Sequence, residues 1–310
     1  MISSDFVDRI SSTKGVRRKD MIEKDIILHQ ILLDLSRENF FSKNFLFKGG
    51  TCLIKHYLGY FRFSEDIDFT WKDQTRFDGK SSRQINEDLS GIIDETGKIL
   101  EKIASKRGLD FKCDKANRDY VELNSRGRIC TFKIWYDSAI LKKRAFLKIQ
   151  INFLDELCLK PQNGDLKSLM TERSQELEAL FAEYSEYAST IPFLMYDVKE
   201  ILSEKIRALL TRRAIKARDF LDIFFISKNI GAKPEDVEEC TITKISYALE
   251  HYERFRENLD DKKMLLDKGS IFEWGAERDL LLAEIDETEF NRFVDEFTKY
   301  LRDLVKKLGS

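Results

Sequence analysis

The chain has 310 residues, of which 42% are hydrophobic, 12% aromatic and 35% charged. This composition supports a folded core and excludes a disordered chain, a collagen-like repeat and a coiled-coil rod. The net charge of −2 identifies no partner, but the charge is unevenly distributed. Residues 112–148 contain ten basic and four acidic side chains, whereas residues 235–310 contain twelve basic and twenty acidic ones. The first segment is therefore the better candidate for contact with a polyanion.

The five cysteines are odd in number, widely scattered and never arranged as a CxxC pair. This pattern predicts neither a disulfide framework nor a zinc site, and it favours reduced thiols in a cytoplasm. No apolar run approaches the roughly 18 residues that a membrane span needs. The first twenty residues carry several charges and have no apolar stretch of the secretory type. We therefore expect a soluble, cytoplasmic protein that does not enter a membrane.

The hydrophobic spacing predicts an α/β (α+β) core with a mixed sheet over residues 1–160, followed by an all-helical lobe over residues 161–310. The predicted elements of the core, in chain order, are helix 20–40, strand 45–47, a short helix capped by Thr51, strand 67–71, helix 85–107 and strands 120–123, 129–135 and 146–153. A break follows at residues 161–164, and beyond it the pattern is helical to the end apart from short connections, one of them near Pro192.

The most informative segment is Lys48-Gly49-Gly50-Thr51, followed after fourteen residues by Asp66-Ile67-Asp68. Carboxylates at positions i and i+2 of a strand point to the same face, where they repel each other unless a cation lies between them. Hard cations such as Mg²⁺ prefer oxygen ligands and complete their shell with substrate phosphates. A Gly-Gly turn that opens into a helix offers backbone N–H groups to a phosphate. The combination is typical of metal-dependent phosphoryl or nucleotidyl transfer.

A second group of polar residues follows in the helical half. Lys205 and Arg212 are seven residues apart, which corresponds to two turns along one helical face. The segment from Lys205 through Arg218 holds six basic residues and no acidic one, counting both ends, and Asp219 and Asp222 then begin a very apolar helix. A solvated basic face is the simplest interpretation. The narrow basic stripe and the two acids at the start of an apolar helix instead favour a functional role for these residues.

Both segments resemble motifs of the AbiEii-type nucleotidyltransferases, which are toxins of abortive-infection and type IV toxin–antitoxin systems. The first resemblance is carried by the Gly-Gly-Thr turn and by Arg62-Phe63-Ser64-Glu65-Asp66-Ile67-Asp68, and the second by Lys205, Ala208 and Arg212 followed by Arg218-Asp219 and Asp222. The resemblance implies a nucleotidyltransferase-like core whose active site is completed by the helical lobe. It also implies a Mg²⁺ (or Mn²⁺) ion, an NTP substrate and a cognate winged-helix antitoxin.

The resemblance also assigns roles to individual residues. Asp66 and Asp68 correspond to the metal-binding and catalytic pair. Lys205 would neutralise nucleotide phosphates, and Asp219 corresponds to an essential downstream acid that orients Lys205 or assists the attacking hydroxyl. The nucleotide-binding residues are expected to be Lys48, Gly49, Gly50, Thr51, Ser64, Lys205 and Arg212. Because Thr51 and Lys205 are far apart in the sequence, we expect the nucleotide to bridge the two lobes.

One position departs from the superfamily pattern. A third acid commonly lies on a later strand, and the matching position in this sequence is Gln150, which leaves open whether one or two metal ions are held. The leading interpretation is transfer of NMP from an NTP to RNA, with a tRNA 3′ end as the favoured acceptor. The alternatives are a nucleotide-binding regulator without turnover and nucleotidyl transfer onto a protein. We expect the basic residues 112–148, including Lys142, Lys143 and Arg144, to contact RNA phosphates.

Overall fold

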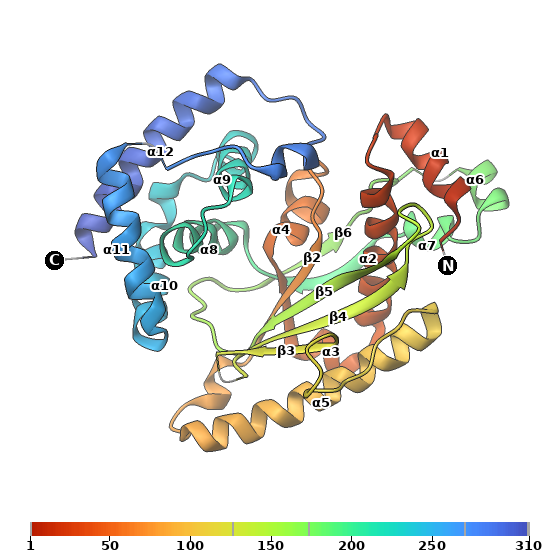
Figure 1. Cartoon of the computed structure of the whole chain (residues 1–310), viewed down its shortest axis with the longest axis horizontal. Coiled ribbons are helices and arrows are strands. Elements are labelled where there is room, and N and C mark those ends of the chain that lie inside the picture. The colour runs from red at the N-terminus through yellow and green to blue at the C-terminus, as the bar shows by residue number, and fades with distance from the viewer. Residues whose placement is uncertain (1, 126, 173, 270, 309–310) are drawn as a thin grey trace. The chain divides into compact units, whose positions relative to one another are not determined.

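The computed structural model describes residues 2–125, 127–172, 174–269 and 271–308 (Figure 1). The chain divides into two compact units. Unit 1 comprises Met1–Asp155 and Gln162–Met195, and unit 2 comprises Glu156–Pro161 and Tyr196–Ser310. Residues 162–195 thus return to the first unit, so the division is not a single cut between residues 160 and 161.

Unit 1 is built on one seven-stranded mixed sheet with the strand order β3-β4-β5-β2-β1-β7-β6. The strands are β1 (Phe45–Lys48), β2 (Asp66–Trp71), β3 (Val121–Asn124), β4 (Ile129–Asp137), β5 (Arg144–Asn152), β6 (Gln162–Leu166) and β7 (Ile191–Met195). Strands β2 and β5 are parallel, as are β1 and β7, and the remaining neighbours are antiparallel. The sheet places β2 in its centre, between β1 and β5.

The helical segments of unit 1 follow from its apolar spacing. They are α1 (Ser4–Lys14), α2 (Lys19–Arg37), α3 (Asn39–Asn44), α4 (Gly49–Cys52), the π-helix Leu53–Leu58, the 3-10 turn Gln74–Phe77, α5 (Ser82–Arg107), α6 (Gln175–Leu180) and α7 (Tyr184–Tyr187). Helix α2 confirms the prediction for residues 20–40, and its length from Met21 to Leu35 is almost entirely buried. Helix α5 confirms the prediction for 85–107 and begins with a capping box at Ser81.

The two faces of the sheet differ because side chains alternate along each strand. On β2, Ile67 and Phe69 are fully buried, whereas Asp66 and Asp68 are half-exposed. On β5, Ile149 and Ile151 are buried and Gln150 between them is exposed. Helices such as α2, which contacts β7, and α5, which contacts β4, supply the apolar partners of the sheet (Figure 1). The predicted same-face arrangement of Asp66 and Asp68 is confirmed.

Two local predictions for unit 1 are wrong. Residues beyond 161 are not all helical, because β6 and β7 complete the sheet. The strand Ile191–Met195 has only five residues, which is too few to distinguish the two-residue repeat of a strand from the repeat of a helix. Its proline, Pro192, is typical of a connection, which is what the sequence predicts there. Thr51 does not cap a helix either. The left-handed backbone of Gly49, at φ +77°, starts the helix two residues earlier, and Thr51 lies inside it.

Unit 2 is helical, so the predicted fold class, an α/β core with a helical C-terminal lobe, is confirmed. Its elements are α8 (Val198–Thr211), α9 (Ala217–Ile230), the 3-10 turn Pro234–Val237, α10 (Glu238–His251), α11 (Glu253–Lys268), the 3-10 turn Ala276–Leu280 and α12 (Glu287–Lys307). Phe224 of α9 and Phe290 of α12 pack edge to face at 5.3 Å within a larger aromatic core. Among the described residues, no helix combines the length and apolarity of a membrane span.

Candidate active site

The turn between β1 and α4 brings backbone and carboxylate into close contact. A Cβ atom on Gly49 would lie 2.3 Å from Oδ2 of Asp68, and one on Gly50 would lie 2.7 Å from a guanidinium nitrogen of Arg62. Larger residues would therefore displace either side chain, quite apart from the left-handed φ of Gly49. The two glycines allow the start of a helix to approach the Asp68 carboxylate and the Arg62 side chain directly.

Hydroxyl groups fasten this turn to the beginning of β2. Thr51, which is 1% exposed, donates through Oγ1 to the backbone carbonyl of Asp66, and that Oγ1 also lies 2.9 Å from Oγ of Ser64. Ser64 is half-buried. The structure therefore gives the Thr51 side chain a bracing role, with its hydroxyl directed at β2 within unit 1.

Two buried cations stand beside the same turn. Lys48 is 6% exposed and pairs with Asp155, with 3.0 Å between Nζ and Oδ2. Arg62 is 1% exposed and donates to the carbonyl of Phe63 at 2.7 Å. Burial of such charges is costly unless each is paired and hydrogen-bonded. The sequence assigns no role to Arg62 or Asp155. A linear motif shows neither the burial of Arg62 nor the ion pair between Lys48 and Asp155, which are 107 positions apart.

The register of β2 against β5 locates the position of the missing third acid. Asp68 is the partner of Gln150 and Asp66 is the partner of Lys148. Since neighbouring residues of paired strands point to one face, the amide of Gln150 and the ammonium of Lys148 share the sheet face of the two carboxylates. The sequence alignment that put Gln150 at this place is thus supported, and β5 contributes no carboxylate at either position.

In unit 2, the second motif folds into one compact ion cluster. Lys205 of α8 lies 2.8 Å from Asp219 and 2.6 Å from Asp222, measured from Nζ to Oδ1 and Oδ2 respectively. Arg212, the residue that caps the C-terminus of α8, lies 3.4 Å from the other oxygen of Asp219. The side chains of Asp219 and Asp222 are at most 2% exposed. Lys205 is therefore not part of a solvated basic face, because it points at two buried acids, whereas Arg212 and Arg213 are exposed.

Electrostatics fix the protonation state of Asp219. Burial alone would raise its pKa, but the charges of Lys205 and Arg212 outweigh burial and hold the pKa well below its usual range. An ionised, doubly paired carboxylate is a weak base. The contacts therefore favour the role in which Asp219 orients Lys205 over the role in which it assists the attacking hydroxyl. Asp222 makes the same kind of contact and belongs to this cluster, although sequence reasoning had given it no separate role.

The basic segment 112–148 is partly neutralised by neighbouring acids. Lys115 pairs with Asp94 at 2.7 Å and Lys133 with Glu122 at 3.2 Å. Arg144 pairs with Asp110 and stacks on the ring of Trp135. Lys142, Lys143 and Lys148 are exposed. These three lysines are the better candidates for contact with a polyanion.

Comparison with known proteins gives a family and two distant structures. JHP933 from Helicobacter pylori is 16% identical, with 94% of this chain and 95% of that chain covered and a TM-score of 0.41. A second H. pylori structure, provisionally described as a nucleotidyltransferase, is 17% identical, with coverages of 93% and 97% and a TM-score of 0.40. Likeness at this level carries no argument about fold or activity. No curated protein matches the chain.

The family comparison is decisive because it extends over nearly the whole chain. The family described as "Nucleotidyl transferase AbiEii toxin, Type IV TA system" matches residues 30–308. This span includes the Gly-Gly-Thr turn, the Asp66–Asp68 pair and the Lys205 cluster. The chain therefore belongs to the AbiEii family of nucleotidyl transferase toxins of type IV toxin–antitoxin systems.

Proposed function

We propose that this protein is a Mg²⁺-dependent nucleotidyltransferase that transfers NMP from an NTP to a hydroxyl of RNA, with a tRNA 3′ end as the acceptor. The acceptor oxygen forms a bond to the α-phosphorus, the bond between that phosphorus and the bridging oxygen breaks, and pyrophosphate leaves. The hydroxyl proton is released to water. The observation that carries this proposal is the pair of half-exposed carboxylates on β2, placed against a Gly-Gly turn.

The residues present fit a hard divalent cation. Asp66 and Asp68 share one face of β2, and Gly49 leaves room for the Asp68 carboxylate directly beside the backbone. Carboxylate oxygens are the donors that Mg²⁺ and Mn²⁺ prefer. When bound there, the ion would neutralise charge on the triphosphate and its leaving group. Gln150 adds an uncharged oxygen donor on the same face, which favours one tightly held ion over two.

The chain's own residues complete the proposed site. The backbone N–H groups at Gly49 and Gly50 bind phosphate oxygens, while Thr51 and Ser64 keep this turn fixed on β2. Lys48 positions the end of β1 through its pair with Asp155. Within unit 2, Asp219 and Asp222 hold the ammonium of Lys205 and Arg212 supports Asp219, and we assign this ammonium to a phosphate of the nucleotide on the family resemblance.

The acceptor is assigned to RNA because of the uneven charge of the chain. Exposed Lys142 and Lys143 lie just before β5, and exposed Lys148 lies on β5 in register with Asp66, on the sheet face of the carboxylates. Contacts of this kind bind phosphates without reading sequence, and they make affinity fall steeply with salt. We also propose the antitoxin implied by the family as a partner, in the form of a winged-helix protein.

A second candidate function is a nucleotide-binding regulator that does not turn over. It is favoured by one observation, the amide of Gln150 in register with Asp68 where the superfamily pattern has an acid. In that case NTP binding would require Asp66 and Asp68, whereas no nucleotide would be incorporated into any acceptor.

The test is incubation of the purified protein with each labelled NTP, Mg²⁺ and either total RNA or total cell protein. We expect label in small RNA and none after chelation of the metal. Label in protein would overturn the RNA assignment, and NTP binding without incorporation would favour the regulator. A charge-reversal variant, Lys142→Glu with Lys143→Glu, should weaken tRNA binding and flatten its salt dependence while leaving NTP binding unchanged. Equal salt slopes for variant and wild type would exclude this turn from the RNA contact.

A further inference from the structure

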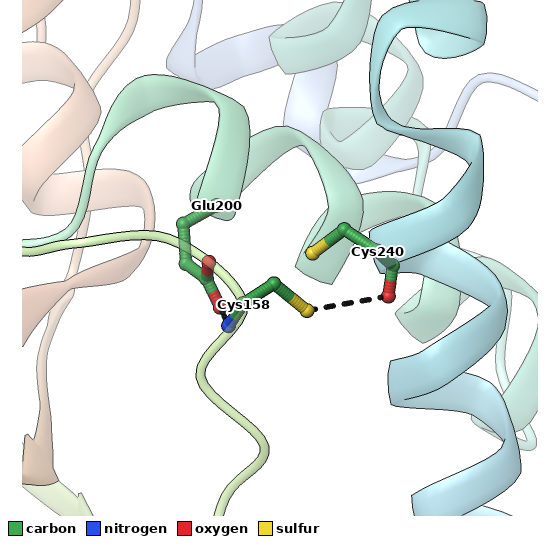
Figure 2. Close-up of side chains that lie close together, drawn as sticks. All are labelled: Cys158, Glu200 and Cys240. Carbon is green, nitrogen blue, oxygen red and sulfur yellow. Dashed lines mark hydrogen bonds between the residues drawn. The ribbon is translucent and has the colours of Figure 1, made fainter.

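Two cysteines and a glutamate of unit 2 lie close together, and none of them has a role in the proposed function. Cys158 lies in the irregular segment Glu156–Pro161, Glu200 on α8 and Cys240 on α10 (Figure 2). Their sulfur and carboxylate oxygen atoms all lie within 4.8 Å of one another. Both cysteines are free and half-buried, so small solutes have access to them. Three segments that are distant in the sequence thus direct potential metal ligands at one point.

The polar contacts of this cluster leave donor capacity. Sγ of Cys158 lies 3.6 Å from the carbonyl of Cys240, and Sγ of Cys240 lies 3.2 Å from Oγ of Ser203. Glu200 is 1% exposed. Its Oε1 accepts from the backbone N–H of Cys158 and pairs with Lys244, whereas its Oε2 accepts from the N–H of Leu159 at 2.8 Å. Since a carboxylate oxygen has two lone pairs, Oε2 retains one for a further partner.

Lys244 sets the charge of the site. It is 1% exposed, lies 2.6 Å from Glu200 Oε1, and also donates to the backbone carbonyl of Glu156. A divalent ion, two thiolates, one carboxylate and this ammonium together have no net charge. An ion can therefore replace the two thiol protons without leaving an uncompensated charge in a half-buried place.

We propose that Cys158, Cys240 and Glu200 form a zinc site that fastens the segment Glu156–Pro161 to helices α8 and α10. Thiolates favour Zn²⁺ over Mg²⁺ and Ca²⁺, and the hard carboxylate favours it over Cu⁺. Three protein donors leave the fourth tetrahedral position to water. The role is structural, because Glu200 already binds the backbone of this segment through two N–H groups and the ion would link the segment to both helices through its three protein ligands.

The first experiment measures metal uptake by the whole chain, reduced with a non-chelating reductant and freed of metal. Zinc titration should show one bound equivalent and raise the thermal midpoint by roughly 5 °C. Cobalt(II), as a spectroscopic probe of the same site, should give a thiolate charge-transfer band. Cys158→Ser and Cys240→Ser should each weaken zinc binding at least about tenfold and remove most of the band. Cys113→Ser, which changes a half-buried cysteine of unit 1, should behave as wild type.

A second measurement needs no variant, in case a substitution prevents folding. Zinc should protect Cys158 and Cys240 of the wild-type chain from alkylation, whereas Cys113 should react at the same rate with and without the ion. Lack of zinc uptake by the reduced chain would overturn the proposal, as would an unaltered cobalt band in both cysteine variants. Equal alkylation of all three cysteines in excess zinc would overturn it too. Conversion of the pair to a disulfide, with no zinc bound by the reduced form, would identify a redox pair instead.

Discussion

The carboxylates of β2 and those of α9 are the same residue type in opposite settings. Asp66 and Asp68 lie half-exposed on an open sheet face, one residue apart on a central strand. Asp219 and Asp222 are buried at the start of a helix and already have a cation, the ammonium of Lys205. Exposed, converging carboxylates suit an ion from solution, whereas buried acids with a built-in lysine stabilise the fold and fix that lysine. In the proposed function, the same residue type thus serves ligand binding in one unit and positioning in the other.

The largest expected effect is a loss of activity without a loss of stability when a carboxylate of β2 is removed. Asp68→Asn should reduce nucleotidyl transfer by at least about a thousandfold, because one charged ligand of the proposed ion is lost. The thermal midpoint measured in EDTA should stay within about 2 °C of wild type, since the side chain is half-exposed and Asn keeps its volume. Steady-state assays and calorimetry on the same preparation provide the comparison. Wild-type rates in this variant would remove Asp68 from the site.

The opposite pattern is expected in unit 2. Lys205→Met leaves Asp219 and Asp222 buried without their shared cation and should cost about 3 kcal/mol of unfolding free energy, as broken buried ion pairs do. Lys199→Met, on an exposed position of the same helix, is the matched control and should cost less than about 0.5 kcal/mol. Urea unfolding measures both. An equal, small loss in the two variants would show that the cluster does not stabilise unit 2.

Acid should destabilise the two units in different pH windows, although the pKa values of the buried His29 and Asp219 are both lowered. Burial, aided by the charge of Lys55, lowers the pKa of His29 to about 3, from an ordinary value of about 6.5. Between these two pKa values His29 is protonated in the unfolded chain and neutral in the folded chain. The unfolding free energy therefore falls as the pH drops from about 6.5 to about 3, by up to about 1.4 kcal/mol per pH unit. The pKa of Asp219 is lowered, so its ion pairs lose strength only below the ordinary carboxyl value of about 3.9.

The measurement is unfolding free energy from pH 7 to pH 4 for wild type, His29→Gln and the control His56→Gln. The His29 variant should flatten the profile, and the His56 variant should follow wild type. Parallel profiles for all three proteins would exclude His29 as the source of acid sensitivity.

The smallest effect tests how the Gly-Gly turn is held on β2. Thr51→Val removes the hydroxyl that donates to Asp66 and contacts Ser64, at nearly constant volume, and should cost about 1–2 kcal/mol of stability. Thr51→Ser retains the hydroxyl and should recover most of that loss. A Val variant as stable as wild type would show that packing alone holds the turn.

The sequence predicted the fold correctly where the apolar residues repeat with helical spacing over many residues or alternate strictly with polar ones. Helices α2 and α5, strand β2 and the pair β4–β5 lie close to their predicted positions because their apolar spacing is unambiguous. The sequence did not predict the short strands β6 and β7. Each has only five residues, one of them a glycine or a proline, which is too few to show an alternating pattern. The helix begins at Gly49 and not after Thr51, because Gly49 adopts a left-handed backbone and has no Cβ to collide with the Asp68 carboxylate, and neither feature is readable from apolar spacing.

The sequence by itself determined the local chemistry of this protein: Asp66 and Asp68 on one strand face, the Gly-Gly turn before them, and a Lys–Arg–Asp motif in the helical half. These follow from spacing along one element, which the backbone geometry fixes. Only the tertiary structure decided which side chains become partners across long separations. It paired Lys48 with Asp155 and brought Cys158 beside Cys240. Such contacts depend on how elements pack, and no linear pattern encodes that packing.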